Sequence, residues 1–149
     1  MAAQLWLLRH GEAEPHAADD ASRVLTPRGE AQAGTAGRAL AALELVFGAV
    51  YTSPKVRALR TAELACAALG VAPIVHEPLR EGFGARDAHE LMVADQRILV
   101  VGHNPDLAQV VYDLTGARVE LKKGGVAGLR DHELLVLLRP RELDAIAGA

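Results

Sequence analysis

The chain has 149 residues, enough for one domain over residues 1–149, and half of them are hydrophobic, which excludes a disordered protein. The net charge is −3, and the 16 basic and 19 acidic residues mix along the chain, which excludes a basic surface for nucleic acid. A single cysteine excludes a disulfide within the chain, and no apolar stretch has membrane-spanning length, so we expect a cytoplasmic protein.

Short apolar runs alternate with helical patterns along the chain, a rhythm typical of an α/β fold. We predict strands over residues 4–8, 49–52, 73–76 and 97–101, and a terminal hairpin from residues 126–129 and 134–138. The aliphatic composition suits buried parallel strands that helices cover. We therefore expect a three-layer α/β sandwich, with a mostly parallel sheet, helices on both faces and a C-terminal hairpin.

The predicted helices share a start signal, in which a good N-cap residue precedes a proline at the first helical position. The three signals are Thr26-Pro27, Ser53-Pro54 and Asn104-Pro105. We predict helices that start there and extend to about residues 45, 69 and 115. Gly70 and Gly116 stand where left-handed caps would end the last two. A shorter helix is predicted over residues 87–94.

Polar residues follow three of the predicted strands: Arg9-His10-Gly11, the segment 53–57 and Gly102-His103-Asn104. In an open α/β sheet, the carboxyl ends of parallel strands form the ligand site. Arginine guanidinium groups match phosphate oxygens, and helix N-termini add N–H groups and a positive dipole. The residues that follow these strands therefore predict a site for a compact dianion such as phosphate at the carboxyl edge of the sheet.

The histidines and arginines of this set suit phosphoryl transfer. A nucleophilic imidazole must be neutral, and neighbouring cations lower the pKa of a histidine. Two arginines and a second histidine could supply the charge stabilisation that the transfer needs. Because no histidine pair has the spacing of a helical metal site, we expect neither a metal nor another cofactor.

Four motifs resemble, in order, the signature segments of the histidine phosphatase superfamily, which is also called phosphoglycerate mutase-like. The motifs are Leu8-Arg9-His10-Gly11-Glu12, Leu25-Thr26-Pro27-Arg28-Gly29, the segment 51–58 and Val101-Gly102-His103-Asn104-Pro105. The resemblance extends from Leu5 to about Leu138. It implies that His10 is the nucleophile and that Arg9, Arg57 and His103 bind and activate the phosphoryl group.

Other positions are less specific. Asn104, next to His103, is a further candidate for phosphate binding. Arg60 departs from the family, since many members have glutamine there, and we expect it on a solvated helix face. The segment 122–127 resembles the Lys-Gly-rich segment of SixA-like members, and it either lines the mouth of the cleft or forms an ordinary exposed turn.

Glu81 has two interpretations. The segment 79–84 resembles the family loop that carries a carboxylic acid, which protonates an alkoxide leaving group. The alternative is a surface glutamate beside a glycine turn. A phosphohistidine substrate needs such an acid less than a phosphate ester does, because imidazole is a good leaving group.

The length of the chain narrows the expected substrate. Only residues 82–102 separate Glu81 from His103, whereas many members that act on small molecules have a long insertion there. The short connection implies an open cleft and resembles SixA-type phosphohistidine phosphatases. We therefore expect a monomeric phosphatase that removes phosphate from phosphohistidine in a protein and binds neither nucleic acid nor membrane. A phosphatase of a small phosphorylated metabolite and a non-catalytic module that binds phosphorylated ligands are the alternatives.

Overall fold

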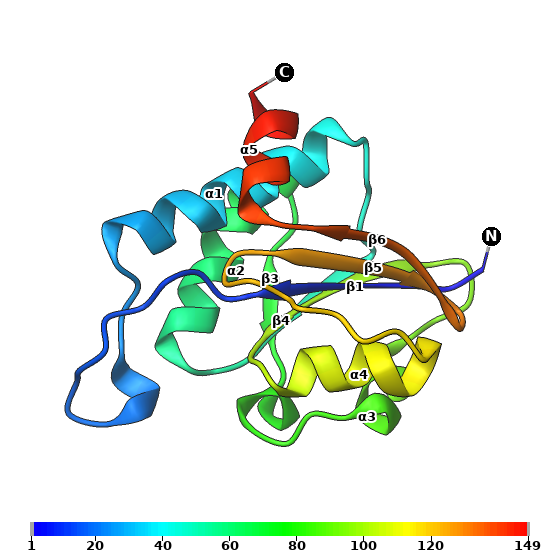
Figure 1. Ribbon diagram of the computed structural model, residues 1–149, viewed down its shortest axis with the longest axis horizontal. Helices are drawn as coiled ribbons and strands as arrows, with labels where there is room; N and C mark the ends of the chain where they lie inside the picture. Colours follow the sequence, from blue (N-terminus) through cyan, green and yellow to red (C-terminus); the bar gives the residue numbers. More distant parts are fainter. Residues whose placement is uncertain (1, 149) are drawn as a thin grey trace.

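The structure, a computed structural model, describes residues 2–148 and contains one six-stranded sheet (Figure 1). The strands are β1 (Gln4–Arg9), β2 (Ala49–Thr52), β3 (Pro73–Val75), β4 (Arg97–Gly102), β5 (Val126–Arg130) and β6 (Glu133–Leu138). Their order is β3-β2-β4-β1-β5-β6, in which the first four strands are parallel and β5 is antiparallel to both neighbours. The prediction of a mostly parallel sheet with a C-terminal hairpin is confirmed.

Helices cover both faces of the sheet, which confirms the predicted three layers (Figure 1). One face packs against α1 (Pro27–Ala42), α2 (Val56–Leu69) and α5 (Pro140–Ala147), and the other against α3 (Ala85–Leu91) and α4 (Asp106–Thr115). The alternation of β1 explains this, since Trp6 and Leu8 enter the first core and Leu5 and Leu7 enter the second.

Small residues let α1 and α2 lie very close together. A Cβ atom added at Gly37 of α1 would lie 2.4 Å from the carbonyl oxygen of Ala65 in α2. The helix surfaces that face each other are otherwise mainly alanine, for example Ala36 and Ala62, both fully buried. The alanine-rich composition therefore serves close helix packing in this layer.

The predicted helix boundaries were right in some places and wrong in others. Thr26 caps α1, because its hydroxyl oxygen accepts a hydrogen bond from Gly29 N–H at 3.0 Å. Gly70 and Gly116 adopt the expected left-handed conformation. However, α2 starts at Val56 rather than Pro54, and α4 starts at Asp106 rather than Pro105.

The later start of α2 follows from the extended backbone of Lys55, whose ψ is 138°. Both expected caps still accept a hydrogen bond from a following backbone N–H, Ser53 from Lys55 and Asn104 from Ala108, and each also has a distant partner. Ser53 hydrogen-bonds His103, and Asn104 donates to the carbonyl oxygen of Leu121 at 3.0 Å. Helix α5 was not predicted from the sequence, although Pro140 occupies its first turn. No helix within residues 2–148 combines the length and the apolar character that crossing a membrane requires.

Candidate active site

The strand register brings the predicted site segments to one edge of the sheet. Arg9 at the end of β1 pairs with Gly102 of β4, and Thr52 at the end of β2 pairs with Val101. His10 N–H then donates to the carbonyl oxygen of Gly102 at 3.1 Å. As a result, the ring centroids of His10 and His103, which are distant in sequence, lie 5.2 Å apart.

Two glycines let the segment after β1 pack directly against the start of α1. A Cβ atom at Gly11 would lie 2.5 Å from the carbonyl oxygen of Gly29, and one at Gly29 would lie 1.9 Å from that of Glu12. Both contacts are with backbone atoms, which cannot move aside as a flexible side chain could. The glycines of two family-like motifs therefore fix the backbone beside His10.

His10 is held as a neutral imidazole with one defined free nitrogen. Its Nδ1 atom donates to the carbonyl oxygen of Gly11 at 2.7 Å, since a carbonyl can only accept. The side chain is buried, and burial, together with the nearby charges of Arg57 and Arg9, lowers its pKa to about 4. Nε2 therefore keeps its lone pair at neutral pH and is available for attack on phosphorus.

His103 has the opposite arrangement of nitrogens. Its Nε2 lies 2.7 Å from Ser53 Oγ, which also accepts a hydrogen bond from Lys55 N–H at 3.2 Å. Burial, followed by the charges of His10 and Arg57, lowers the pKa of His103 to about 3. We assign the Ser53 hydroxyl as donor to Nε2, which leaves the proton of the neutral ring on Nδ1. This Nδ1 atom is buried and has no hydrogen-bond partner among residues 2–148.

The two arginines are anchored by carbonyl groups and keep donors free. Arg9 Nη1 donates to the carbonyl oxygen of Leu121 at 2.9 Å, and Arg57 Nη1 donates to that of Asp20 at 2.8 Å. The Nε atoms of both arginines are buried and lack a partner within the described part of the chain. Since buried donors are normally satisfied, these two N–H groups and Nδ1 of His103 suit an anion.

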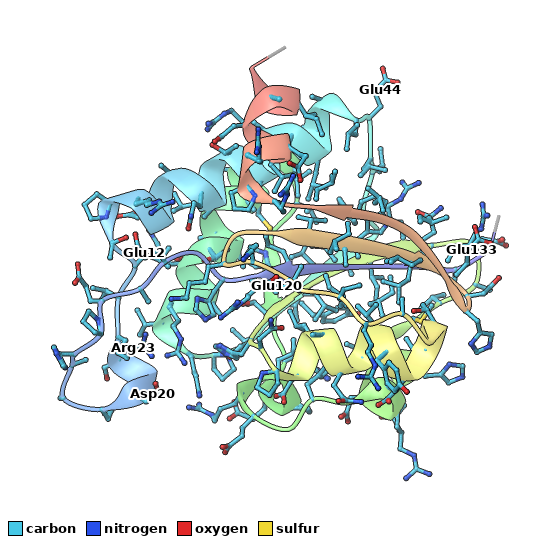
Figure 2. All side chains as sticks on the ribbon, viewed as in Figure 1. Glu12, Asp20, Arg23, Glu44, Glu120 and Glu133 are labelled. Carbon is cyan, nitrogen blue, oxygen red and sulfur yellow. The ribbon has the colours of Figure 1, made fainter. Side chains whose placement is uncertain are left out.

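The structure adds Asp20, which the sequence analysis did not select. Asp20 lies between β1 and α1, at the start of the short 3₁₀ helix Asp20–Ser22, which Arg23 directly follows (Figure 2). Its Oδ2 atom accepts hydrogen bonds from Lys55 Nζ at 3.0 Å and Arg57 Nη2 at 3.1 Å. The hydrogen bonds from Lys55, Arg23 and Arg57 hold the pKa of Asp20 well below its usual range. The only sequence signal was an acidic pair at 19–20 near the first motif.

Asn104 contacts protein atoms. Its Nδ2 donates to the same Leu121 carbonyl as Arg9, and its Oδ1 accepts from Ala108 N–H at 3.3 Å. These bonds give Asn104 a part in positioning the loop, and its contact with phosphate stays a prediction.

The side chains of Glu81 and Arg60 form no hydrogen bond with the histidines and arginines described above. Glu81 is exposed in the loop that precedes α3, and its side chain forms no hydrogen bond or ion pair with residues 2–148. Arg60 is on an exposed surface of α2 and pairs with Glu30 at 3.0 Å.

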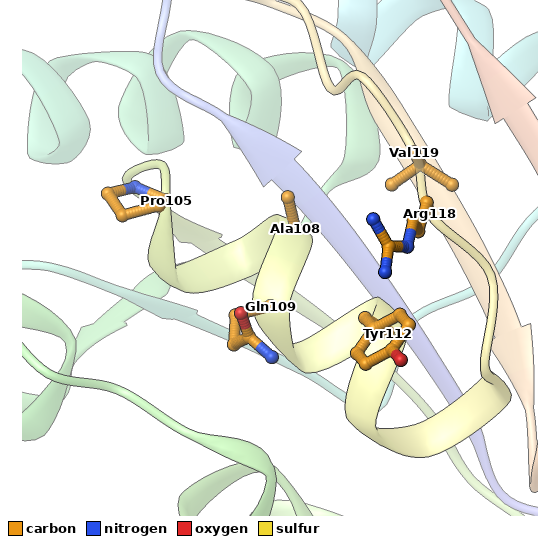
Figure 3. A pocket seen from close by; sticks show the side chains of 6 residues that line it. All are labelled: Pro105, Ala108, Gln109, Tyr112, Arg118 and Val119. Atoms are coloured by element: carbon orange, nitrogen blue, oxygen red, sulfur yellow. The ribbon is translucent and has the colours of Figure 1, made fainter.

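A groove of about 380 Å³ along α4 differs from this site in chemistry (Figure 3). It begins at Pro105, next to the His103 loop, and its one cation, Arg118, lies over the ring of Tyr112 at 5.5 Å. It has no histidine or carboxylate in its lining. Over residues 2–148, no three histidine, cysteine, aspartate or glutamate side chains group closely enough to hold a metal ion.

Comparisons with known proteins find one relative in sequence and several solved structures with a similar fold. An uncharacterized protein of Picosynechococcus sp. is 36% identical, over 94% of this chain and 98% of its own length. The solved structure of the protein histidine phosphatase SixA with tungstate is 22% identical, with a TM-score of 0.80 over 94% of this chain and 99% of that one. A phosphoserine phosphatase of Entamoeba histolytica with 3-phosphoglyceric acid is 18% identical, with a TM-score of 0.76 over 94% and 98%.

The match to the family itself covers residues 5–99, from β1 into β4, and includes Arg9, His10 and Arg57. His103 lies beyond its end, and the strand register places it beside His10. The chain therefore belongs to the histidine phosphatase superfamily (branch 1).

Proposed function

We propose that the chain is a metal-independent phosphatase that forms a phosphohistidine intermediate on His10 and acts on phosphohistidine in a protein. The observation that carries the proposal is the neutral His10, whose Nδ1 is fixed by Gly11 and whose Nε2 is free. His103, Arg9 and Arg57 surround it with donors that suit the oxygens of a phosphoryl group.

The reaction has two steps. The Nε2 lone pair of His10 forms a bond to phosphorus while the bond from phosphorus to the nitrogen of the substrate imidazole breaks, and that nitrogen takes a proton from water. Water then attacks phospho-His10, the bond from phosphorus to Nε2 breaks, and inorganic phosphate leaves as the proton of the water passes to solvent. Arg9 and Arg57 stabilise the equatorial oxygens in both steps, and Nδ1–H of His103 donates to one of them.

The choice of a protein substrate has two supports. The connection between Glu81 and His103 is short, and it is built from one turn, α3 and β4, without an inserted lid. The departing imidazole also needs little acid catalysis, so this reaction does not depend on Glu81, whose side chain forms no hydrogen bond or ion pair with residues 2–148.

A phosphatase of small phosphate esters is the second candidate. Glu81 favours it, since this exposed carboxyl forms no ion pair within the described residues and is free to approach an alkoxide. The likeness in fold to a phosphoserine phosphatase is compatible with it. A purely phosphate-binding module would have no use for a histidine held neutral with a free Nε2.

The nucleophile can be tested by trapping. We expect wild-type protein mixed with ³²P-labelled phosphohistidine peptide and quenched within milliseconds to hold acid-labile, base-stable label. His10→Ala should hold none and should lose at least about 10³-fold in kcat. His16→Ala, which removes an exposed histidine, is the matched control and should behave as wild type. Equal labelling of His10→Ala would contradict the proposal.

The substrate class can be tested at Glu81. If the protein acts on phosphohistidine, Glu81→Gln should leave kcat on a phosphohistidine peptide within about twofold of wild type. If it is an ester phosphatase, the same variant should lose about 10²-fold or more on esters, and the wild type should prefer esters. Glu77→Gln, in the preceding turn, controls for loss of a surface charge.

A further inference from the structure

A second groove, of about 460 Å³, opens beside Arg9 and is strongly basic. Its lining consists of Arg9, Glu12, Arg28, Gln32, Glu120, Lys122, Lys123, Arg139, Pro140 and Arg141. Six of these residues are cationic and two are carboxylates, in a chain whose net charge is −3. This local excess of positive charge favours an anionic ligand.

The groove is attached directly to the His10 segment. Gly124 N–H donates to the carbonyl oxygens of both Arg9 and His10 at 3.0 Å, which fixes the turn that carries Lys122 and Lys123. Two of its lining residues, Glu12, just beyond β1, and Glu120, on the segment after α4, are labelled in Figure 2. A substrate with its phosphoryl group at His10 would therefore extend into the groove past Arg9.

Some cations of the groove already form ion pairs with carboxylates. Arg139 donates to the Glu142 carboxylate through Nε and Nη2, each at 2.9 Å. Lys122 Nζ donates to Glu120 Oε1 at 2.6 Å. Two other exposed cations of the lining, Arg28 and Lys123, have no hydrogen-bond or ion-pair partner among residues 2–148. The groove thus offers two free cations in surroundings that suit carboxylate side chains.

We propose that this groove binds an acidic segment of the protein that carries the phosphohistidine, with Arg28 and Lys123 as the residues that select it. The inference rests on the proposed function. A flexible acidic segment fits better than a compact polyphosphate, since the cations are spread over four separate segments and the carboxylates of Glu12 and Glu120 line the same walls.

The test uses two phosphohistidine peptides of equal length, one with glutamates beside the phosphohistidine and one with glutamines in their place. For wild type, KM for the acidic peptide should be about fivefold lower than for the neutral peptide, with similar kcat. Arg28→Ala/Lys123→Ala should lose this preference by raising KM for the acidic peptide alone. The control double variant, Arg38→Ala/Arg130→Ala, removes two exposed arginines outside the groove and should keep the preference for the acidic peptide.

At about 1 M salt, where the Debye length is about 3 Å, the wild-type preference should disappear. The proposal is overturned if wild type shows no preference, if the preference survives at 1 M salt, or if the double variant raises KM for both peptides equally. It is also overturned if the double variant leaves KM for both peptides unchanged and raises KM for fructose 1,6-bisphosphate but not for fructose 6-phosphate. The groove would then serve a small polyanion. Hydrolysis of para-nitrophenyl phosphate without hydrolysis of either peptide would mean that the proposed function itself fails.

Discussion

At the scale of single residues, the site depends on which nitrogen of each histidine carries the proton. The carbonyl oxygen of Gly11 accepts a hydrogen bond from Nδ1–H of His10, and the Ser53 hydroxyl hydrogen-bonds Nε2 of His103. Low pKa values of about 4 and about 3 keep both rings neutral at physiological pH. In the proposed mechanism one ring therefore attacks while the other donates, although both are histidines of the same site.

Ser53 is expected to act as a positioning residue for His103. Ser53→Ala removes the hydrogen bond at 2.7 Å and frees the ring to rotate or change tautomer. We expect kcat to fall about tenfold, as the loss of one such bond in the transition state implies, with KM little changed. Steady-state kinetics measures this split, and ¹⁵N spectra of the His103 ring report the tautomer.

Ser22→Ala, at an exposed serine bonded to Asp19, is the control for Ser53→Ala and should keep wild-type kcat. An unchanged kcat in Ser53→Ala, or an unchanged ring spectrum, would contradict the positioning role.

Asp20 is expected to compete with phosphate. Its carboxylate accepts hydrogen bonds from both Lys55 and Arg57. Asp20→Asn should free these cations to bind an anion, and should lower the inhibition constant of tungstate by about threefold or more. Inhibition assays at fixed pH measure this constant. Asp19→Asn removes the same charge from the neighbouring residue and keeps a good cap for the 3₁₀ helix, so it should have little effect. Weaker inhibition in Asp20→Asn would instead mean that Asp20 orients Arg57.

At the scale of elements, close packing decides where helices lie and local signals decide where they end. Thr26, Gly70 and Gly116 act as the sequence predicts, since a cap depends on neighbours within a few residues. The start of α2 differs from the prediction because Lys55 has an extended backbone, with ψ of 138°. Ser53 and Asn104 each accept a hydrogen bond from a following backbone N–H and also hydrogen-bond a residue far away in the chain. Residues beside the site thus serve the helix start and the site together.

The contact of α1 with α2 gives a prediction with an internal control. Gly37→Ala should lower the free energy of unfolding by about 2 kcal/mol, because the new methyl group overlaps the Ala65 backbone. Gly34→Ala, one turn earlier, meets only the flexible end of Arg38 at 3.1 Å and should raise stability by about 0.5–1 kcal/mol. Urea unfolding of both variants measures the difference, and equal effects would contradict the packing argument.

At the scale of the whole molecule, the buried histidines couple stability to pH. A histidine whose pKa is about 6.5 when unfolded and about 4 when folded binds a proton more readily in the unfolded state between these values. The stability that His10 and His103 contribute is therefore present above about pH 6.5 and is lost as pH falls toward 4.

Urea unfolding at pH 7 and pH 5 tests this coupling. Wild type should lose on the order of 1–2 kcal/mol more than His10→Gln between the two pH values, since the variant lacks one of the two coupled groups. His16→Gln, at an exposed position, should follow wild type. A wild-type loss no greater than that of His10→Gln would show that burial of His10 does not control acid stability.

The amino-acid sequence by itself determined the α/β class and every strand of the sheet to within a residue or two, and it predicted the histidines and arginines that the fold brings together. These are readable because hydrophobic periodicity is local and because Arg9, His10, Arg57 and His103 stand directly after apolar runs or in short motifs. The family that these motifs resemble is the one to which the chain belongs.

Only the tertiary structure decided the tautomers, the bond of Asp20 to Arg57 and the basic groove beside Arg9. Ser53 and His103 are 50 residues apart and Asp20 and Arg57 are 37 apart, so no local pattern announces either pair. The groove joins residues near positions 9, 28, 122 and 139, which are neighbours only after the sheet and its helices have assembled. Charge spread along a chain becomes a surface only when folding brings it together.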